Sequence, residues 1–155
     1  MNMAIVVAGP AQLPGLVDSV HALFAEDGGR HDHRMDLGWP RRDGPRYYST
    51  LLADDTALCL VAQQENAVVG HLVGRIGGGE PLRPDAVTAV LESMRVAPEA
   101  RGSGVGSALV ARFDSWAGKR GARHFSVTAY SANDSAIAFY RRHGFREMSV
   151  TLARA

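Results

Sequence analysis

Apolar and polar residues follow two kinds of spacing along this chain, and each kind predicts a different element. Apolar runs and alternating apolar positions predict strands at 4–8, 57–63, 67–77, 86–96, 124–130 and 145–153. Apolar residues spaced by three or four predict helices at 11–27 and 133–143, a third helix that the glycine loop at 101–107 opens and Gly121 ends, and a shorter helix around 45–54. Strands and helices of this size alternate along most of the chain, which is typical of a layered α/β protein.

The connections complete the predicted architecture. Residues 64–66 join two strands as an antiparallel hairpin. Residues 28–44 are rich in glycine, proline and charge and predict an exposed irregular loop, and 77–85 predict a second flexible connection. The order β-α-α-β-β-β-α-β-α-β predicts one domain over residues 1–155, with a mixed, mostly antiparallel central sheet and helices on both faces.

Composition narrows the function classes. Seventeen Lys and Arg against sixteen Asp and Glu give a net charge of +1, which provides no general attraction to nucleic acid or an anionic membrane. The single cysteine, Cys59, excludes an intramolecular disulfide and a cysteine-rich zinc site. The start of the chain lacks the pattern of a secretion signal, and no apolar run approaches the ~20 residues of a membrane span. We therefore expect a cytoplasmic protein with no membrane or nucleic-acid partner.

The stretch RGSGVGS at 101–107 carries three glycines on alternate positions at the start of a predicted helix. It lacks the lysine of a P-loop, and Ser107 stands where the dinucleotide fingerprint needs its third glycine. A tight turn remains an alternative. The other interpretation of this stretch is a phosphate-binding site, because backbone N–H groups at a helix N-terminus bind anions and Arg101 adds a positive charge.

Two linked stretches resemble the GNAT superfamily of acyl-CoA-dependent N-acyltransferases. LESMRVAPEARGSGVGSALV (91–110) is similar to its diphosphate-binding motif A, and NDSAIAFYRRHGF (133–145) is similar to its motif B. With the strand between them, they cover residues 87–145. The resemblance implies the family's fold, in which the fourth and fifth strands splay apart and acetyl-CoA enters the cleft between them.

The resemblance also implies which residues bind acetyl-CoA, with no metal required. Backbone groups of Met94 and Val96 would contact the pantetheine arm, and Asn133, Ser135 and Ala136 would border it. Asn133 is equally well explained as a helix cap. The diphosphate would lie on the amides of the glycine loop, namely Arg101, Gly102, Ser103, Gly104, Val105, Gly106 and Ser107.

The implied reaction is direct attack of an amine on the thioester carbonyl through a tetrahedral intermediate. Met94 N–H would stabilise the oxyanion, and Tyr140 would protonate or hydrogen-bond the leaving thiolate. Glu92 lies two residues before Met94, so strand alternation predicts that both side chains share a face. We expect Glu92 to take the amine proton, directly or through water; a solvent-facing strand carboxylate or an anchor for a cationic acceptor is the alternative.

The acceptor is less defined. Candidate residues for an amine lie at the end of the first helix and in the loop after it, namely Glu26, Asp27, Asp32, Asp36 and Trp39. Because arginines lie in the same stretch, its net electrostatic field is not clearly negative. His31, Asp32 and His33 lack a third ligand at metal-site spacing, so no metal is expected.

Three functions stay open. The first is N-acetylation of a small-molecule primary amine, and the second is acetylation of a protein lysine or N-terminal α-amine. The third is a non-catalytic acyl-CoA-binding module, which the presence of Tyr140 and Glu92 disfavours. The family often forms homodimers, but no feature of this sequence indicates one.

Overall fold

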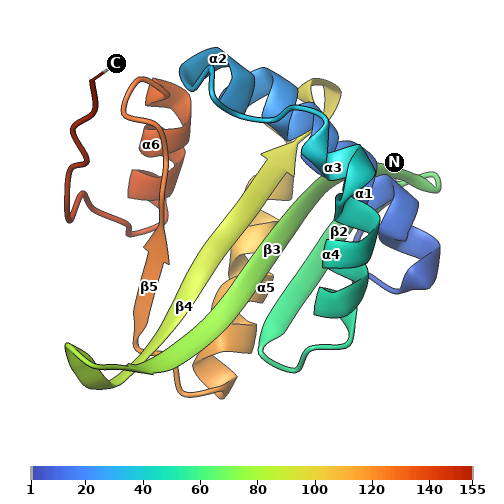
Figure 1. Ribbon diagram of the computed structural model, residues 1–155. Helices are drawn as coiled ribbons and strands as arrows, with labels where there is room; N and C mark the ends of the chain where they lie inside the picture. The colour runs from blue at the N-terminus through green and yellow to red at the C-terminus, as the bar shows by residue number, and fades with distance from the viewer. Residues whose placement is uncertain (1, 155) are drawn as a thin grey trace.

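The structure is a computed structural model that describes residues 2–154. One five-stranded sheet runs in the order β1-β2-β3-β4-β5 (Figure 1). Neighbouring strands are antiparallel from β1 to β4, whereas β4 and β5 are parallel. The mixed sheet is therefore as the sequence predicted. The strands are β1 (Met3–Val7), β2 (Ala57–Gln64), β3 (Ala67–Glu80), β4 (Arg83–Val96) and β5 (His124–Val127).

Helices cover both faces of this sheet. Figure 1 shows α5 against one face, while α1, α3 and α4 lie against the other. A π-helical turn at Phe24–Gly28 extends α1. Among the described residues, no helix is long and apolar enough to cross a membrane. The helices are α1 (Leu13–Leu23), α2 (Gly29–His31), α3 (Trp39–Arg42), α4 (Gly44–Leu52), α5 (Val105–Lys119) and α6 (Asp134–Arg142).

Each face of the sheet has its own apolar core. On the α5 face, Leu109 and Phe113 are fully buried against Leu72 of β3. The ring of Phe113 lies so near the backbone of β3 that a methyl group on Gly74 would come within 2.6 Å of it. On the α1/α4 face, the core includes Leu16, Val17, Val20, Tyr48, Leu51, Val61 and Val73.

The hairpins are tighter than the sequence suggested. Glu65 and Asn66 have φ values of 50° and 69°, which fits a two-residue turn between β2 and β3. The predicted flexible connection at 77–85 is wrong, because β3 and β4 continue to Glu80 and from Arg83. Glycines lower strand propensity, but pairing along two long strands outweighs that preference here.

β4 contains a bulge at Glu92. Val73 of β3 pairs with Ser93, whereas the next residue, Gly74, pairs with Leu91. Glu92 is thus the extra residue on β4. A bulge of this kind re-aims side chains and increases the local twist of the strand.

β4 and β5 separate at the bulge, because their pairing ends at Leu91, one residue before Glu92. Their parallel pairing runs from Thr88 opposite His124 to Leu91 opposite Val127, and β5 ends there. From Glu92 to Val96, β4 therefore has no strand partner on its β5 side. This is the splay that the resemblance implied.

Two further predictions need correction. The predicted strand at 145–153 does not form, and Met148, Val150 and Leu152 are 72%, 79% and 90% exposed. Alternation gave that segment an apolar face, but none of the strands within residues 2–154 pairs with it to cover that face. The predicted loop at 28–44 contains the short helices α2 and α3.

Candidate active site

The glycine loop forms a backbone cradle before α5. Gly102 and Gly104 have φ values of 77° and 87°, a left-handed conformation that glycine adopts without strain. A side chain at either position would meet no atom within 4 Å, so the loop faces open space. The Ser103 hydroxyl donates to the carbonyl of Ala100 at 2.6 Å, and this hydrogen bond ties the loop to the residue before Arg101.

The N-terminus of α5 has no side-chain cap. Gly104 occupies the cap position and provides no accepting atom, so N–H groups of the first turn stay available for an anion. The α5 helix is held close to α6, since a methyl group on Gly106 would come within 3.0–3.1 Å of the Phe139 ring. Ser107 Oγ lies 3.1 Å from His143 Nε2 beyond α6. Binding of a diphosphate by the loop, the helix terminus and Arg101 stays a prediction.

Arg101 is tied to two other parts of the site. Its Nε donates to the carbonyl of Val96 at 2.9 Å, and its Nη2 lies 3.3 Å from a carboxylate oxygen of Glu26. Arg95 binds the same carboxylate more closely, with Nη2 donating at 2.7 Å. The Arg95 hydrogen bond lowers the pKa of Glu26 despite partial burial. Val96 O is thus already occupied by Arg101, which limits what Val96 offers a ligand.

Asn133 is the cap of α6 and also a bridge to the end of α1. Its Oδ1 accepts from Ala136 N–H and from the Ser135 hydroxyl, both at 3.1 Å. Its Nδ2 donates to Asp27 Oδ1 at 2.9 Å. The capping interpretation is therefore confirmed. Contact of Asn133, Ser135 and Ala136 with pantetheine stays a prediction.

Tyr140 lies on α6 and packs its ring against the core of the α5 face. Its ring meets those of Phe139 and Phe145 edge-on. Burial raises the pKa of Tyr140 to about 12, and the charge of Asp27 adds to the shift. The hydroxyl therefore stays protonated at neutral pH, as a hydrogen-bond donor must.

Glu92 lies on the α1/α4 face of the sheet. Tyr47 of α4 donates its hydroxyl hydrogen to the Glu92 carboxylate, at 3.0 Å from Oε1 and 2.9 Å from Oε2. Arg75 Nη1 of β3 lies 4.0 Å from Glu92 Oε1. Burial and the Glu92 hydrogen bond raise the pKa of Tyr47.

The predicted shared face of Glu92 and Met94 is wrong. Met94 packs on the α5 face, near Gly106. Ser93 faces the other way, toward His71 of β3. The bulge explains the difference, because the extra residue breaks the alternation of side chains. The backbone N–H of Met94 is unaffected by this correction, and it still lies in the unpaired stretch of β4.

A pocket opens next to Glu92. It measures about 410 Å³, and its wall includes Trp39, Asp43, Arg46, Tyr47, Asp54 and Arg75. Tyr47 and Arg75 also contact Glu92, so pocket and carboxylate are adjacent. The Trp39 ring packs on Phe24 at 6.0 Å and meets the Tyr47 ring at 5.4 Å. Sequence reasoning found Trp39 here but missed Tyr47 and Arg75, which carry no motif.

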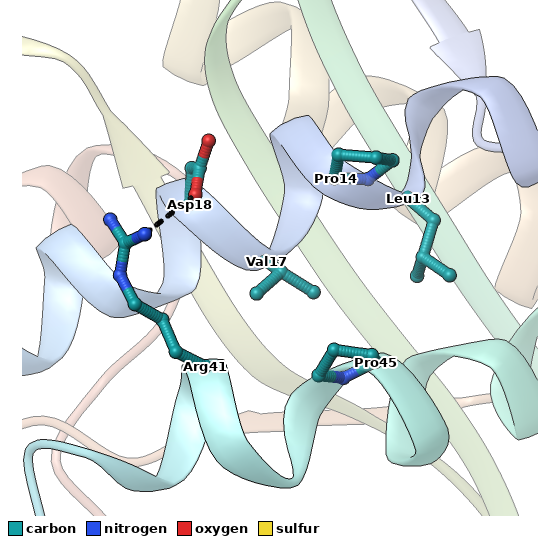
Figure 2. A pocket seen from close by; sticks show the side chains of 6 residues that line it. All are labelled: Leu13, Pro14, Val17, Asp18, Arg41 and Pro45. Carbon is teal, nitrogen blue, oxygen red and sulfur yellow. Dashed lines mark ion pairs between the residues drawn. The ribbon is translucent and has the colours of Figure 1, made fainter.

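A second groove is lined by other residues than the predicted active site. Figure 2 shows it between α1 and the segment from α3 to α4, lined by residues such as Leu13, Val17 and Pro45. An ion pair between Arg41 and Asp18, at 3.5 Å, closes one side. No predicted catalytic or binding residue lines this groove.

The acidic candidates of the acceptor region are not free to bind an amine. Glu26 holds Arg95, and Asp27 holds Asn133 and lies 3.6 Å from His31 Nε2. Neither lines the pocket beside Glu92. Asp32 and Asp36 are likewise paired with nearby arginines. Within residues 2–154, no three His, Cys, Asp or Glu side chains gather as a metal site would require.

A buried polar chain connects α1 to the bulge. His71 is fully buried on β3, with Nδ1 2.6 Å from Ser19 Oγ and Nε2 2.8 Å from Ser93 Oγ. Burial lowers the pKa of His71 to about 3, and the charge of Arg95 adds to this. The imidazole is therefore neutral at physiological pH. One of its ring nitrogens donates a hydrogen bond to one serine hydroxyl, and the other nitrogen accepts one from the other hydroxyl. In the sequence, the only sign of this polar chain is a single histidine among apolar residues of a predicted strand.

Solved structures of similar fold cover almost the whole chain. The aminoglycoside antibiotic 6'-N-acetyltransferase AAC(6')-IG from Acinetobacter haemolyticus is 22% identical, with a TM-score of 0.77 and coverage of 100% of this chain and 97% of that one. AAC(6')-Iy, solved with a bisubstrate analog containing CoA, is 18% identical, with a TM-score of 0.79 and coverage of 100% and 99%. At these identities the likeness shows a shared fold.

Sequence comparison gives the family. The acetyl transferase GW6a from Oryza sativa subsp. japonica is 35% identical over 63 residues, which are 41% of this chain and 15% of that protein. The profile of the Acetyltransferase (GNAT) family matches residues 19–145, which contain the glycine loop, β4 and α6. The chain belongs to the acetyltransferase (GNAT) family.

Proposed function

We propose that this protein acetylates the primary amine of a small molecule by direct transfer from acetyl-CoA. The observation that carries the proposal is the position of Glu92. Its side chain is 30% exposed, next to both the pocket and the unpaired edge of β4. A carboxylate that water and an amine can reach, next to the strand edge expected to hold the thioester, suits a base.

The residues of this chain divide the work as follows. The glycine loop and Arg101 bind the diphosphate, and the edge of β4 aligns the acyl group, which acetyl-CoA supplies as an activated thioester. Glu92 accepts the amine proton, directly or through water. Met94 N–H donates to the carbonyl oxygen as it gains charge.

Tyr140 donates a hydrogen bond to the leaving sulfur. A phenol whose pKa is about 12 is a weaker acid than a thiol with an ordinary pKa of about 8.5. Hydrogen bonding, rather than complete proton transfer, is therefore the role that we assign to Tyr140.

A small acceptor is favoured over a protein because polar contacts join the turn after α1 to β4 and to α6. Glu26, at the end of α1, is bound to Arg95 of β4, and Asp27 is bound to Asn133 at the start of α6. These contacts narrow the space that a peptide would have to occupy. They leave the 410 Å³ pocket, which is of a size for small molecules.

The test is thiol release from acetyl-CoA with a panel of amines and a lysine-containing peptide. We expect turnover of small amines, and a loss of about 10²–10⁴-fold in kcat for Glu92→Gln at unchanged acetyl-CoA affinity. Glu65→Gln, in the turn between β2 and β3, is the matched control. Turnover of the peptide alone, or full activity of Glu92→Gln, would contradict the proposal. Tight binding of acetyl-CoA without turnover of any amine would support the acyl-CoA-binding module instead.

A further inference from the structure

The pocket beside Glu92 has a charge pattern that limits its ligand. Two carboxylates, Asp43 and Asp54, and two guanidinium groups, Arg46 and Arg75, lie in its wall. Their formal charges cancel, so total charge does not decide which ligand fits. What decides it is which of these groups the protein has already satisfied.

Both carboxylates are engaged. Asp43 accepts from Arg42 Nε at 2.9 Å. Asp54 accepts from the N–H and the hydroxyl of Thr56, at 2.8 and 2.7 Å. These hydrogen bonds lower the pKa of Asp54. Neither carboxylate therefore needs a cationic ligand.

The guanidinium groups keep their donors. Arg75 is a hydrogen-bond partner of Tyr47 and forms longer ion pairs with Asp54 at 3.7 Å and Glu92 at 4.0 Å, so some of the five N–H donors of its guanidinium group stay available to a ligand. Arg46 forms no ion pair or side-chain hydrogen bond with any residue in the range 2–154. Arg75 is also 36% exposed, so a ligand can reach its planar face and edge. The hydrogen-bond donors that the pocket offers a ligand are therefore those of its two guanidinium groups.

From this pattern we propose that the acceptor carries a carboxylate next to its amine, as an amino acid does. This inference rests on the proposed function, since it places the amine at Glu92. The carboxylate binds the fork of Arg75, which matches the geometry of two carboxylate oxygens. The side chain of the acceptor extends along Trp39.

The short span between the two anchors sets the class of acceptor. Arg75 Nη1 and Glu92 Oε1 are 4.0 Å apart, so the groups that they bind must lie on the same or neighbouring carbons. A polyamine or aminoglycoside has no carboxylate to bind the guanidinium group of Arg75 and would leave those donors without an acceptor. The pocket therefore differs in preference from the aminoglycoside acetyltransferases whose fold it shares.

The experiment compares matched acceptors in the thiol-release assay. Phenylalanine and tryptophan are tested against phenethylamine and tryptamine, which lack only the carboxylate, and kanamycin represents the polycations. We expect kcat/KM for the amino acids to exceed that for the matched amines by at least about tenfold, the scale of one charge-assisted hydrogen bond.

Arg75→Gln separates recognition from catalysis. It should raise KM for the amino acids by about 10–100-fold, and it should abolish the preference for an amino acid over its matched amine, whatever loss of kcat both classes share through the contact of Arg75 with Glu92. Arg75→Lys keeps a charge without the fork and should lie between the two; it also serves if Arg75→Gln does not fold. Arg83→Gln, at the far turn of the β3–β4 hairpin, is the control and should behave as the wild type.

The outcomes distinguish two failures. If the decarboxylated amines or kanamycin are acetylated as well as the amino acids, or if Arg75→Gln lowers both classes equally, the carboxylate site is refuted while the proposed function stands. If no amine is acetylated by protein that binds acetyl-CoA, the proposed function fails and this inference fails with it.

Discussion

Tyr47 and Glu92 are joined on one face of the sheet, where the Tyr47 hydroxyl lies 2.9 and 3.0 Å from the two oxygens of the Glu92 carboxylate. One residue is on α4 and the other is the bulged residue of β4, so the contact fixes the acceptor-side helix to the strand that we expect to align the acyl group. It also leaves each oxygen of Glu92 able to accept a second hydrogen bond.

Tyr47→Phe tests whether this contact positions the carboxylate. Removing the hydroxyl frees Glu92 to rotate, so we expect kcat to fall by about 3–10-fold, on the scale of a hydrogen bond worth about 1 kcal/mol. Steady-state kinetics with a saturating amine, together with acetyl-CoA titration, measure the effect. Unchanged kcat, or a loss confined to acetyl-CoA affinity, would show that Tyr47 does not act through Glu92.

Tyr140→Phe tests the donor to the leaving sulfur. We expect kcat to fall by about 10–100-fold, because a hydrogen bond to a charged acceptor is lost, while acetyl-CoA affinity stays close to that of the wild type. Tyr130→Phe, at the loop before α6, controls for loss of a tyrosine hydroxyl nearby. Equal turnover of Tyr140→Phe and the wild type would remove Tyr140 from the reaction.

Substitutions at Gly104 and Gly106 test the diphosphate cradle. Gly118, near the end of α5, provides the control. Gly104→Val forces a β-branched residue into a left-handed backbone and should abolish acetyl-CoA binding in a folded protein. Gly106→Ala places a methyl group 3.0 Å from Phe139 and should weaken both binding and stability. Gly118→Ala meets no atom within 4 Å and should stabilise the protein by up to about 1 kcal/mol. Calorimetric titration and thermal unfolding measure these effects, and normal binding by Gly104→Val would refute the diphosphate cradle.

His71 makes stability depend on pH. Its folded pKa is about 3, whereas an unfolded histidine titrates near 6.5. The unfolded chain therefore takes up the proton first as pH falls, so the stability contributed by neutral His71 is complete above about pH 6.5 and is lost progressively toward pH 3. Between pH 7 and pH 5, we expect a loss of about 2 kcal/mol in the free energy of unfolding.

Urea unfolding at several pH values checks this expectation. His71→Gln should be less stable at pH 7 and should lose this part of the acid dependence. His124→Gln, with an exposed histidine, should keep it. An identical acid slope in His71→Gln and the wild type would show that the buried imidazole is not the cause.

The features that could be predicted from the sequence are those set by residues close together in the chain. The glycine loop and the Asn133 cap depend on residues within a few positions of each other, so their geometry follows from the motif. The pocket joins α4 to β3, and its Arg75 and Tyr47 are brought together only by the packed sheet. The orientation of Glu92 escaped prediction because a bulge is a property of two paired strands, here β3 and β4, and not of one. Residues 145–153 show the same limit, since alternation specifies an apolar face without specifying what covers it.

The bulge at Glu92 also bears on how this gene can change. Loss of the Glu92 codon would bring Leu91 and Ser93 next to each other and return β4 to plain alternation, opposite a β3 that already pairs with both residues. The strand would keep its partners while losing Glu92, the carboxylate that accepts from Tyr47 of α4. A deletion scan along β4 would therefore find one codon whose loss the fold tolerates and the reaction does not.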